Sequence, residues 1–506
     1  MINQCRECGS TRVIRKGTRQ TATGLKQRFR CVDCGETYSV LMDEDHSAIE
    51  EKSVMVFTAA VSGCAADLAF FNALEYYCRV RDAKLIIMPI RYKNPTKKEE
   101  DAAYDDDEID PYLAPYVTEE PIVNSDVKFR ALCDLKIQAT ADSPLTGMEP
   151  LAKGYNTIIG HPQLQMKTIM QRDSSIPLFL TTTGCVTLPV FSKTKAGYKA
   201  HFHHSASAIV VEFDSDGIIH MRQLNFDGVG FYDLDAYYTD NTRVSNDRVE
   251  AVIVGDEHVI FMDEKVKAAT YTDEDSIMNV LDPKVIVRHD VLDCYAISHH
   301  HRHNFFVKYK KGLDGLDNIA TELEQTLKHI LDTTREDQLS VIVASNHNDH
   351  LCKWLNESDP KSDQVNAKLY HYLMYSMIDH LEETGQIGNP FKMYSKLRHG
   401  DVERIKFLGR NDSFMVSDIE LADHGDAGFN GSRGSRKQYS NLSKKTVIGH
   451  SHNPGIEKSC YQVGTSTKLR LEYNTGPSNW ANTHCVIYPN GKRQLITIIN
   501  GKWRMV

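Results

Sequence analysis

Five short strings of histidine, aspartate and asparagine residues carry the clearest chemistry in this 506-residue sequence. Each string follows a short apolar run that we expect to form a strand. Imidazole, carboxylate and amide groups together are typical ligands of divalent metals such as Mn, Fe or Zn. Because sites in α/β proteins gather at strand ends, we expect the five strings to meet at one sheet edge. The strings are Gly255-Asp256-Glu257-His258, His289-Asp290-Val291-Leu292-Asp293, Ser345-Asn346-His347-Asn348-Asp349, Asp423-His424-Gly425-Asp426 and Gly449-His450-Ser451-His452.

Such a ligand set suits the hydrolysis of phosphate esters. That reaction needs positive charge on the phosphate oxygens and a hydroxide nucleophile at neutral pH. Two metal ions about 3.5–4 Å apart supply both, since they lower the pKa of a bound water to about 7. A metal pair also needs a bridging carboxylate within a shell of His, Asp and Asn ligands, and the five strings contain these residue types.

In this order the five strings resemble the calcineurin-like metallophosphoesterases, whose pattern runs D-x-H, G-D-x-x-D, G-N-H-[DE], a lone His and G-H-x-H. The resemblance covers about residues 250–455, followed by a β-rich tail to about 503. It implies two divalent metals, Mn first with Fe, Zn or Mg as alternatives. It also implies that His347 binds no metal and acts on the leaving oxygen as a general acid. The implied ligands are Asp256, His258 and His452 for the first metal, Asp290 as the bridge, and Asn346, His424 and His450 for the second.

The sequence departs from the family pattern at three positions. His289 stands where a glycine is usual before the bridging aspartate, and Ser345 replaces the glycine of the third string. Asn348 separates His347 from the acidic Asp349, so the partner of His347 stays open. For the lone histidine of the fourth motif we choose His424, because it follows a predicted strand.

Two cysteine pairs near the start predict a separate metal site. The spacing C-x2-C-x22-C-x2-C supplies four thiolates, the number that a structural zinc ion takes in a ribbon. Residues 1–40 hold eight Lys/Arg and three Asp/Glu, so their net charge is 8 − 3 = +5, whereas the whole chain carries −9. The segment resembles the zinc ribbons at the start of many transposases, which implies contact with DNA; a stability or protein-interaction module is the alternative. The four cysteines are Cys5, Cys8, Cys31 and Cys34.

The remaining pattern predicts an α/β protein of several parts. We expect a zinc ribbon at 1–40, a linker at 41–53, an α/β region of unknown role at 54–245 and the metallophosphoesterase domain at 246–506. That last domain is expected to be a two-sheet β-sandwich flanked by helices. No internal repeat is evident. The sequence has no run of eighteen apolar residues and no apolar leader, so we expect a cytoplasmic protein without a membrane partner.

Three further residues are candidates for contact with the substrate. His300 and Arg302 lie in a histidine-rich stretch after the second string, and Arg433 lies in a glycine-rich stretch after His424. A plain polar surface loop is the alternative for both stretches.

The order of ribbon, α/β region and phosphoesterase strings is also similar to a group of phage proteins that degrade host DNA early in infection. The similarity rests on the strings ADHG and IGHSH and on the tail NWANTHCVIYPNGKRQLITIINGKW. It implies a metal-dependent DNA nuclease, and a homo-oligomer is left open. The alternatives are a phosphatase or small-molecule phosphodiesterase that uses the ribbon for assembly, or a DNA-binding regulator.

Overall fold

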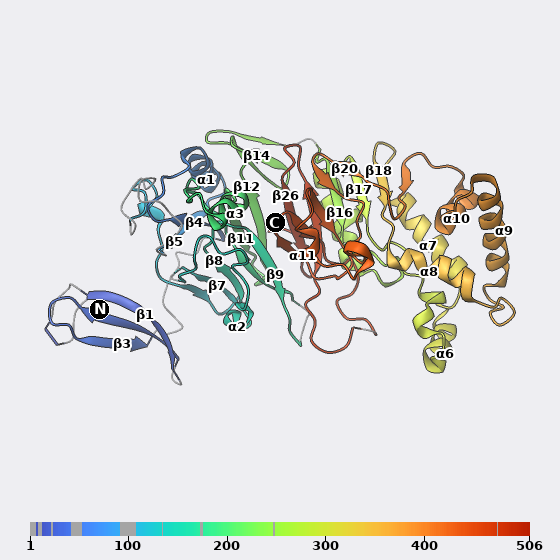
Figure 1. The fold of residues 1–506 in the computed structure, drawn as a ribbon, viewed down its shortest axis with the longest axis horizontal. Helices are drawn as coiled ribbons and strands as arrows, with labels where there is room; N and C mark the ends of the chain where they lie inside the picture. The colour runs from blue at the N-terminus through green and yellow to red at the C-terminus, as the bar shows by residue number, and fades with distance from the viewer. Residues whose placement is uncertain are drawn as a thin grey trace.

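The computed structural model describes residues 7–8, 13–21, 24–41, 53–91, 108–133, 135–172, 176–245, 248–472 and 474–505. Most of the predicted linker at 41–53 lies outside these ranges, as does Cys5. The expected α/β class is confirmed, since strands and helices alternate along the chain (Figure 1). Within the described ranges, no helix has the length and apolar character needed to cross a membrane.

The N-terminal segment forms a small antiparallel sheet. Its strands pair only with one another among the described residues, in the order β1-β2-β3. The strands are β1 (Val13–Thr21), β2 (Gly24–Cys31) and β3 (Thr37–Leu41).

Two layers of sheet make up the rest of the protein. One layer is a ten-stranded sheet; the other consists of a four-stranded and a six-stranded sheet. The ten strands are, in sheet order, β20 (Met415–Val416), β21 (Ile419–Glu420), β22 (Lys445–Ile448), β24 (Cys460–Gln462), β23 (Gly455–Glu457), β9 (Gln165–Ile169), β10 (Leu178–Thr182), β8 (Asn156–Ile159), β7 (Phe129–Leu132) and β6 (Ile122–Asn124).

The smaller sheets face this large one. The four-stranded sheet contains β12 (Ile219–Asn225), β11 (Ser207–Phe213), β4 (Val54–Val61) and β5 (Lys84–Ile90). The six-stranded sheet contains β19 (Ile405–Phe407), β18 (Leu339–Ile342), β17 (Val285–Arg288), β16 (Ala251–Val254), β25 (Asn482–Ile487) and β26 (Arg493–Ile498). A short hairpin sheet follows β12 and is formed by β13 (Phe231–Asp233), β14 (Ala236–Tyr238) and β15 (Arg243–Ser245).

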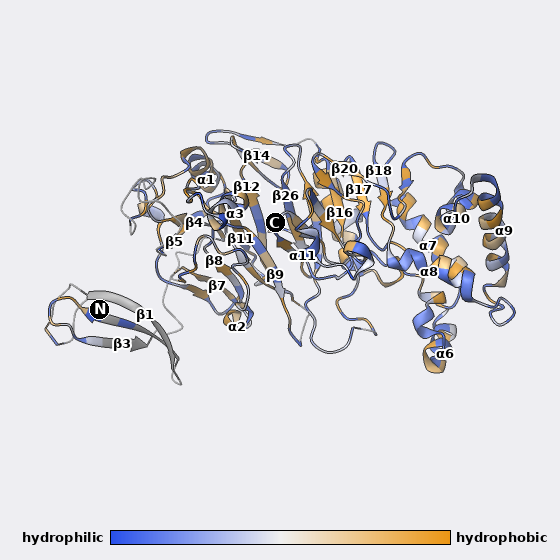
Figure 2. Cartoon of the chain, in the orientation of Figure 1, coloured by the Kyte–Doolittle hydropathy of each residue, from blue (hydrophilic) through white to orange (hydrophobic). Residues whose placement is uncertain are grey.

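Side-chain alternation explains why these strands are buried on both faces. In β4, Met55 and Phe57 belong to the core between the two layers, whereas Val54 and Val56 pack with Phe70 of helix α1 (Leu68–Val80). Burial of each large apolar side chain contributes about 1.5–3 kcal/mol. Figure 2 shows the same concentration of hydrophobic residues in β16 and β17.

The two halves of this body have the same strand order. Residues 54–245 contribute β12-β11-β4-β5 and β9-β10-β8-β7-β6, and the second half contributes β26-β25-β16-β17 and β23-β24-β22-β21-β20. Every neighbouring pair runs in the same relative direction in both halves. The expectation that the chain has no internal repeat is therefore wrong at the level of topology.

The halves join through equivalent strands. β9 pairs with β23 antiparallel, and Met166 lies opposite Ile456. These two residues hold the same place in their own hairpins, since Met166 pairs with Thr181 and Ile456 pairs with Tyr461. An approximate two-fold axis thus passes through this pair. The expected boundary near residue 245 lies between parts that share one sheet and one core.

Among the residues that the structure describes, only the second half carries a large helical insertion. Its helix α7 buries Leu323, Leu327 and Ile330, whose spacing is that of one helix face. The Asn318 side chain accepts hydrogen bonds from the N–H groups of Ala320 and Thr321 and so caps the start of α7. The insertion contains α6 (Phe305–Asp314), α7 (Ile319–Asp332), α8 (Asn346–Glu357), α9 (Ala367–Thr384) and α10 (Pro390–His399) (Figure 1).

Candidate metal centre

The ends of three strands bring the predicted ligands together. β16 and β17 are parallel neighbours, so the strings that follow them emerge at the same edge. The His258 N–H donates to the Asp290 carbonyl at 2.8 Å, which fixes these two strings to each other. β22 lies in the facing sheet and leads into Gly449 and His450.

One group of donors is compact and fully buried. Asp256, His258, Asp290 and His452 each offer a ligand atom, and these atoms all lie within 4.8 Å of one another. His452 Nε2 is 3.1 Å from Asp256 Oδ2, and His258 Nε2 is 3.7 Å from Asp290 Oδ2. The four residues are at most 5% exposed, so water does not screen their charges.

A second group of donors also lies close to Asp290. His424 Nε2 is 2.9 Å from Asp290 Oδ2, and the rings of His424 and His450 are 5.3 Å apart. His289 joins this group, with Nδ1 3.2 Å from His424 Nδ1. Asn346 begins α8, and its Oδ1 is buried. Asp290 is therefore the carboxylate that faces both groups of donors.

The donor set fits divalent cations. Asp256 Oδ1, Asp290 Oδ1 and Asn346 Oδ1 are buried and accept no hydrogen bond from any residue that the structure describes. An unpaired buried oxygen is costly, and a bound ion is one of the ordinary explanations. The His258 and His452 Nε2 atoms approach to 3.2 Å, a distance at which two lone pairs need a proton or a cation between them.

Several of the same residues have a strained backbone. Four candidate ligands have left-handed φ angles that a residue with a side chain rarely adopts. Each such residue costs on the order of 1–3 kcal/mol and persists only where the surrounding structure holds it, most often at functional sites. The four are His258 (37°), Asp290 (41°), His450 (76°) and His452 (57°).

A glycine lets the two sheets approach each other at this point. A Cβ atom on Gly449 would meet Asp256 Oδ1 at 2.3 Å and the His289 Cγ atom at 3.0 Å. Only glycine therefore fits between β22 and the ligand strings of β16 and β17.

The charges at the centre stabilise its carboxylates. Burial alone would raise the pKa of Asp290, but His424 and His347 hold the pKa of Asp290 well below its usual range. Burial lowers the pKa of His258, yet the hydrogen bond and charge of Asp293 outweigh it and raise the pKa of His258 to about 9. The pKa of His289 falls to about 4, mainly because the ring is buried.

Asp293 is the partner of His347 that the sequence left open. His347 Nδ1 lies 2.8 Å from the Asp293 carbonyl and 3.6 Å from the Asp293 carboxylate. The same carboxylate is 2.7 Å from His258 Nδ1. Asp349, the acid that follows His347 in the string, instead forms an ion pair with Arg410 at 2.6 Å. The sequence signal for Asp293 was its position as the last residue of the second string.

The sequence motifs did not indicate a buried ion pair that lies behind the candidate ligands. Glu257, between Asp256 and His258, accepts hydrogen bonds from Arg288 at 2.8 Å and from Tyr271 at 2.6 Å. Burial raises the pKa of Glu257, but the charge of Arg288 outweighs it and lowers that pKa to about 2. The backbone that carries Asp256 and His258 is thus anchored from behind.

The three candidate substrate contacts make contacts with different parts of the chain. His300 belongs to the short turn η6 (His299–His301), and its ring is 5.8 Å from that of His350. Arg302 donates to the Glu357 carbonyl at 2.6 Å and is half exposed. Arg433 is exposed in the loop after His424. Its backbone forms an isolated antiparallel β-bridge with Ala427.

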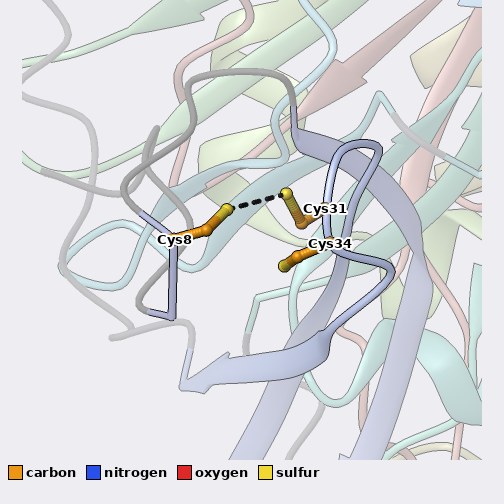
Figure 3. Close-up of side chains that lie close together, drawn as sticks. All are labelled: Cys8, Cys31 and Cys34. Carbon is orange, nitrogen blue, oxygen red and sulfur yellow. Dashed lines mark hydrogen bonds between the residues drawn. The ribbon is translucent and has the colours of Figure 1, made fainter.

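Three of the four predicted zinc ligands lie together in the N-terminal sheet. Cys8, Cys31 and Cys34 offer sulfur atoms within 4.8 Å of one another, and the Sγ atoms of Cys8 and Cys31 are 3.5 Å apart (Figure 3). The backbone N–H of Cys34 is the main cause that lowers the pKa of Cys31, to about 6. A thiolate at neutral pH is the form that binds metal. Cys5 lies outside the described residues.

The first half has the same backbone arrangement at the equivalent strand ends, but without the equivalent candidate ligands. Ala59 forms the same parallel backbone bridge to Cys185 that Asp256 forms to Thr465. β5, the counterpart of β17, ends at Ile90 without a carboxylate.

A histidine stands at one equivalent position in both halves. His161 follows β8 and a glycine, as His450 follows β22 and a glycine. The His161 ring is buried and contacts the carbonyl oxygens of Gln138 and Gln163 at 3.2 and 3.4 Å. Its nitrogens are therefore engaged by backbone, and the described residues of 54–245 contain no comparable group of candidate ligands.

Comparison with curated proteins finds a relative in a bacteriophage. Protein A1 of Escherichia phage T5 is 31% identical over 445 residues, which cover 86% of this chain and 80% of that protein. None of the known protein-family models matches the chain. No solved structure matches it either.

Proposed function

Because the chain belongs to the protein family of Protein A1 from Escherichia phage T5, we propose that it is a phage metallophosphoesterase that hydrolyses DNA at a dinuclear metal centre. The observation that carries this proposal is the buried set of Asp256, His258, Asp290 and His452, whose ligand atoms lie within 4.8 Å of one another. His424 at 2.9 Å from Asp290 extends the set to a second ion.

The residues divide the work of phosphodiester hydrolysis between them. Bound divalent metals, Mn by preference, would lower the pKa of a water and neutralise phosphate charge. Asp290 would bridge the two metals; its Oδ2 atom lies 3.7 Å from His258 Nε2 and 2.9 Å from His424 Nε2, which supports this role. Asp256 and His452 complete one ligand group, and Asn346 and His450 the other.

His347 would act on the leaving oxygen. A carbonyl oxygen only accepts, so the contact with Asp293 makes Nδ1 the N–H donor and turns Nε2 away from it. The side chain is 25% exposed, unlike the ligands around it. When protonated, His347 can donate the Nε2 proton to the departing oxygen, which is general acid catalysis.

Two features support DNA as the substrate. Residues 1–40 carry a net charge of +5, suited to a phosphate backbone, and they resemble ribbons that contact DNA. The ribbon, with its three clustered cysteines, would bind one structural zinc ion.

One observation favours a second candidate function. The chain outside residues 1–40 carries a net charge of −9 − 5 = −14, which repels a polyanion. A phosphatase or small-molecule phosphodiesterase, with the ribbon used for assembly, is the function that this charge favours.

The test is incubation of the full-length protein with linear and circular double-stranded DNA, with Mn, with Mg and with a chelator. Asp256→Ala runs beside it, and the matched control is His371→Ala, an exposed histidine on α9. We expect Mn-dependent degradation by the wild type and the control and none by Asp256→Ala. Intact DNA in every lane, with bis-nitrophenyl phosphate hydrolysed, would instead establish the small-substrate enzyme.

A further inference from the structure

A second cluster of histidines lies beside the candidate centre. His299 and His300 belong to the turn η6, and His350 lies in the second turn of α8. Each offers a ring nitrogen, and the three nitrogens lie within 4.8 Å of one another. The ring centroids of His299 and His300 are 3.9 Å apart, and those of His299 and His350 are 4.8 Å apart.

The rings of this cluster have unused nitrogens. His299 Nδ1 and His350 Nδ1 are buried and make no hydrogen bond to any residue within the described ranges. Burying such a group without a partner costs about 1–3 kcal/mol, so two of them side by side indicate a bound group. His350 is only 9% exposed, which keeps bulk water from satisfying it.

Burial also favours the neutral form of two of these rings. A histidine binds metal as the neutral imidazole. Burial, with the nearby charge of His347, lowers the pKa of His350 to about 4. Burial likewise lowers the pKa of His299, with His300 adding to the effect. The lone pairs of His299 and His350 are therefore available at neutral pH.

We propose that His299, His300 and His350 bind a further divalent metal ion, zinc by preference, distinct from the dinuclear centre and from the ribbon. Three imidazoles are a common zinc ligand set, and they leave a fourth position open to an external oxygen. None of the three residues belongs to the ligand strings of the dinuclear centre.

The position of the cluster suggests what occupies the open position. The His347 ring lies between the two sites, 4.7 Å from the His258 ring and 5.1 Å from the His350 ring. If the proposed function holds, a substrate phosphate faces His347. The neighbouring phosphate of a polynucleotide would then supply the oxygen ligand for the further metal. This part of the inference rests on the proposed function; the metal site does not.

The test is the zinc content of the full-length protein after metal depletion and equilibrium dialysis against zinc. We compare the wild type with His350→Ala, with Asp290→Ala and with the control His371→Ala. We expect His350→Ala to bind one zinc ion fewer per chain, while the control matches the wild type. We expect Asp290→Ala to lose metal at the dinuclear centre and to keep the ion that His350 holds. Equal zinc content in His350→Ala and the wild type overturns the proposal.

A second variant distinguishes loss of the metal site from misfolding caused by the buried substitution His350→Ala. His300 is exposed, so His300→Ala removes a ligand without opening the core, and it must also lose one zinc ion. The substrate role is tested separately by KM. We expect His300→Ala to raise KM for DNA more than KM for bis-nitrophenyl phosphate; equal effects contradict the phosphate role. Zinc content does not depend on catalytic turnover. The zinc measurement therefore tests the metal site even if the protein does not degrade DNA.

Discussion

At the scale of single residues, Asp290 is the carboxylate on which both groups of donors depend. It lies 2.9 Å from His424 and faces His258 across the site. We expect Asp290→Ala to lose bound metal and to reduce phosphodiester hydrolysis to background, measured by metal content and turnover. Asp349→Asn is the matched control, because that carboxylate pairs with Arg410 outside the donor set. An Asp290→Ala protein with full metal content and normal turnover would show that the bridge is assigned wrongly.

His347 has a different role, and its loss has a different signature. It contacts Asp293 and lies beside the ligands without joining the four-residue donor group. We expect His347→Ala to keep both metals and to lower kcat by about 10²–10⁴, the range for a general acid. Metal content and single-turnover rates check this. Loss of a metal in this variant would make His347 a ligand instead.

At the scale of elements, the approach of β22 to β16 depends on Gly449. A Cβ atom there would lie 2.3 Å from Asp256 Oδ1, so Gly449→Ala must push one ligand string away from the other. We expect weaker metal binding with the fold retained, measured by metal titration and circular dichroism. Gly409→Ala is the control, since its added Cβ meets nothing closer than 3.6 Å. Equal metal affinity in both variants would contradict the tight contact.

The N-terminal ribbon can unfold while the rest of the protein stays folded. Its strands pair only among themselves within the described residues, and the Cys31 thiolate belongs to the cysteine cluster. We expect Cys31→Ser to lose zinc and the order of the ribbon while residues 54–505 stay folded, as judged by limited proteolysis. Hydrolysis of bis-nitrophenyl phosphate should persist, and DNA binding should fall. Unchanged activity on DNA would show that the ribbon is not the DNA anchor.

At the scale of the whole molecule, the shared sheet makes the two halves depend on each other. Met166 and Ile456 pair across the junction and both lie in the core that spans the halves. We expect a single calorimetric transition for residues 54–505. We also expect Ile456→Ala to destabilise both halves together, by about 2–5 kcal/mol. Hydrogen exchange resolved by residue distinguishes this from two independent transitions, which would show that the halves fold separately.

A buried charge network adds an acid sensitivity to the same body. Glu212 on β11 pairs with Arg222 on β12 at 2.8 Å and accepts from the Met505 N–H at 3.0 Å. Burial raises the pKa of Glu212, but Arg222 outweighs it and lowers the pKa to about 2. A depressed folded pKa stabilises the protein above the unfolded value, and this stability is lost as pH falls toward about 2.

We therefore expect about 3 kcal/mol of stability to disappear between about pH 5 and 2. Denaturant titrations at several pH values measure it. Glu212→Gln should flatten that part of the profile, although the variant starts less stable because Arg222 loses one of its partners. An unchanged slope in Glu212→Gln would assign the acid sensitivity to other groups.

The sequence by itself determined the α/β class and the strings of histidine and carboxylate residues at the ends of β16, β17 and β22. These features are local, since apolar periodicity selects the element and polar residues mark where a buried strand ends. Only the tertiary structure decided that Asp293 rather than Asp349 meets His347, and that His350 lies against the turn of His299 and His300. It alone revealed the repeated strand order. A core requires alternating apolar side chains of suitable size rather than particular residues, so two halves keep one topology while their sequences diverge.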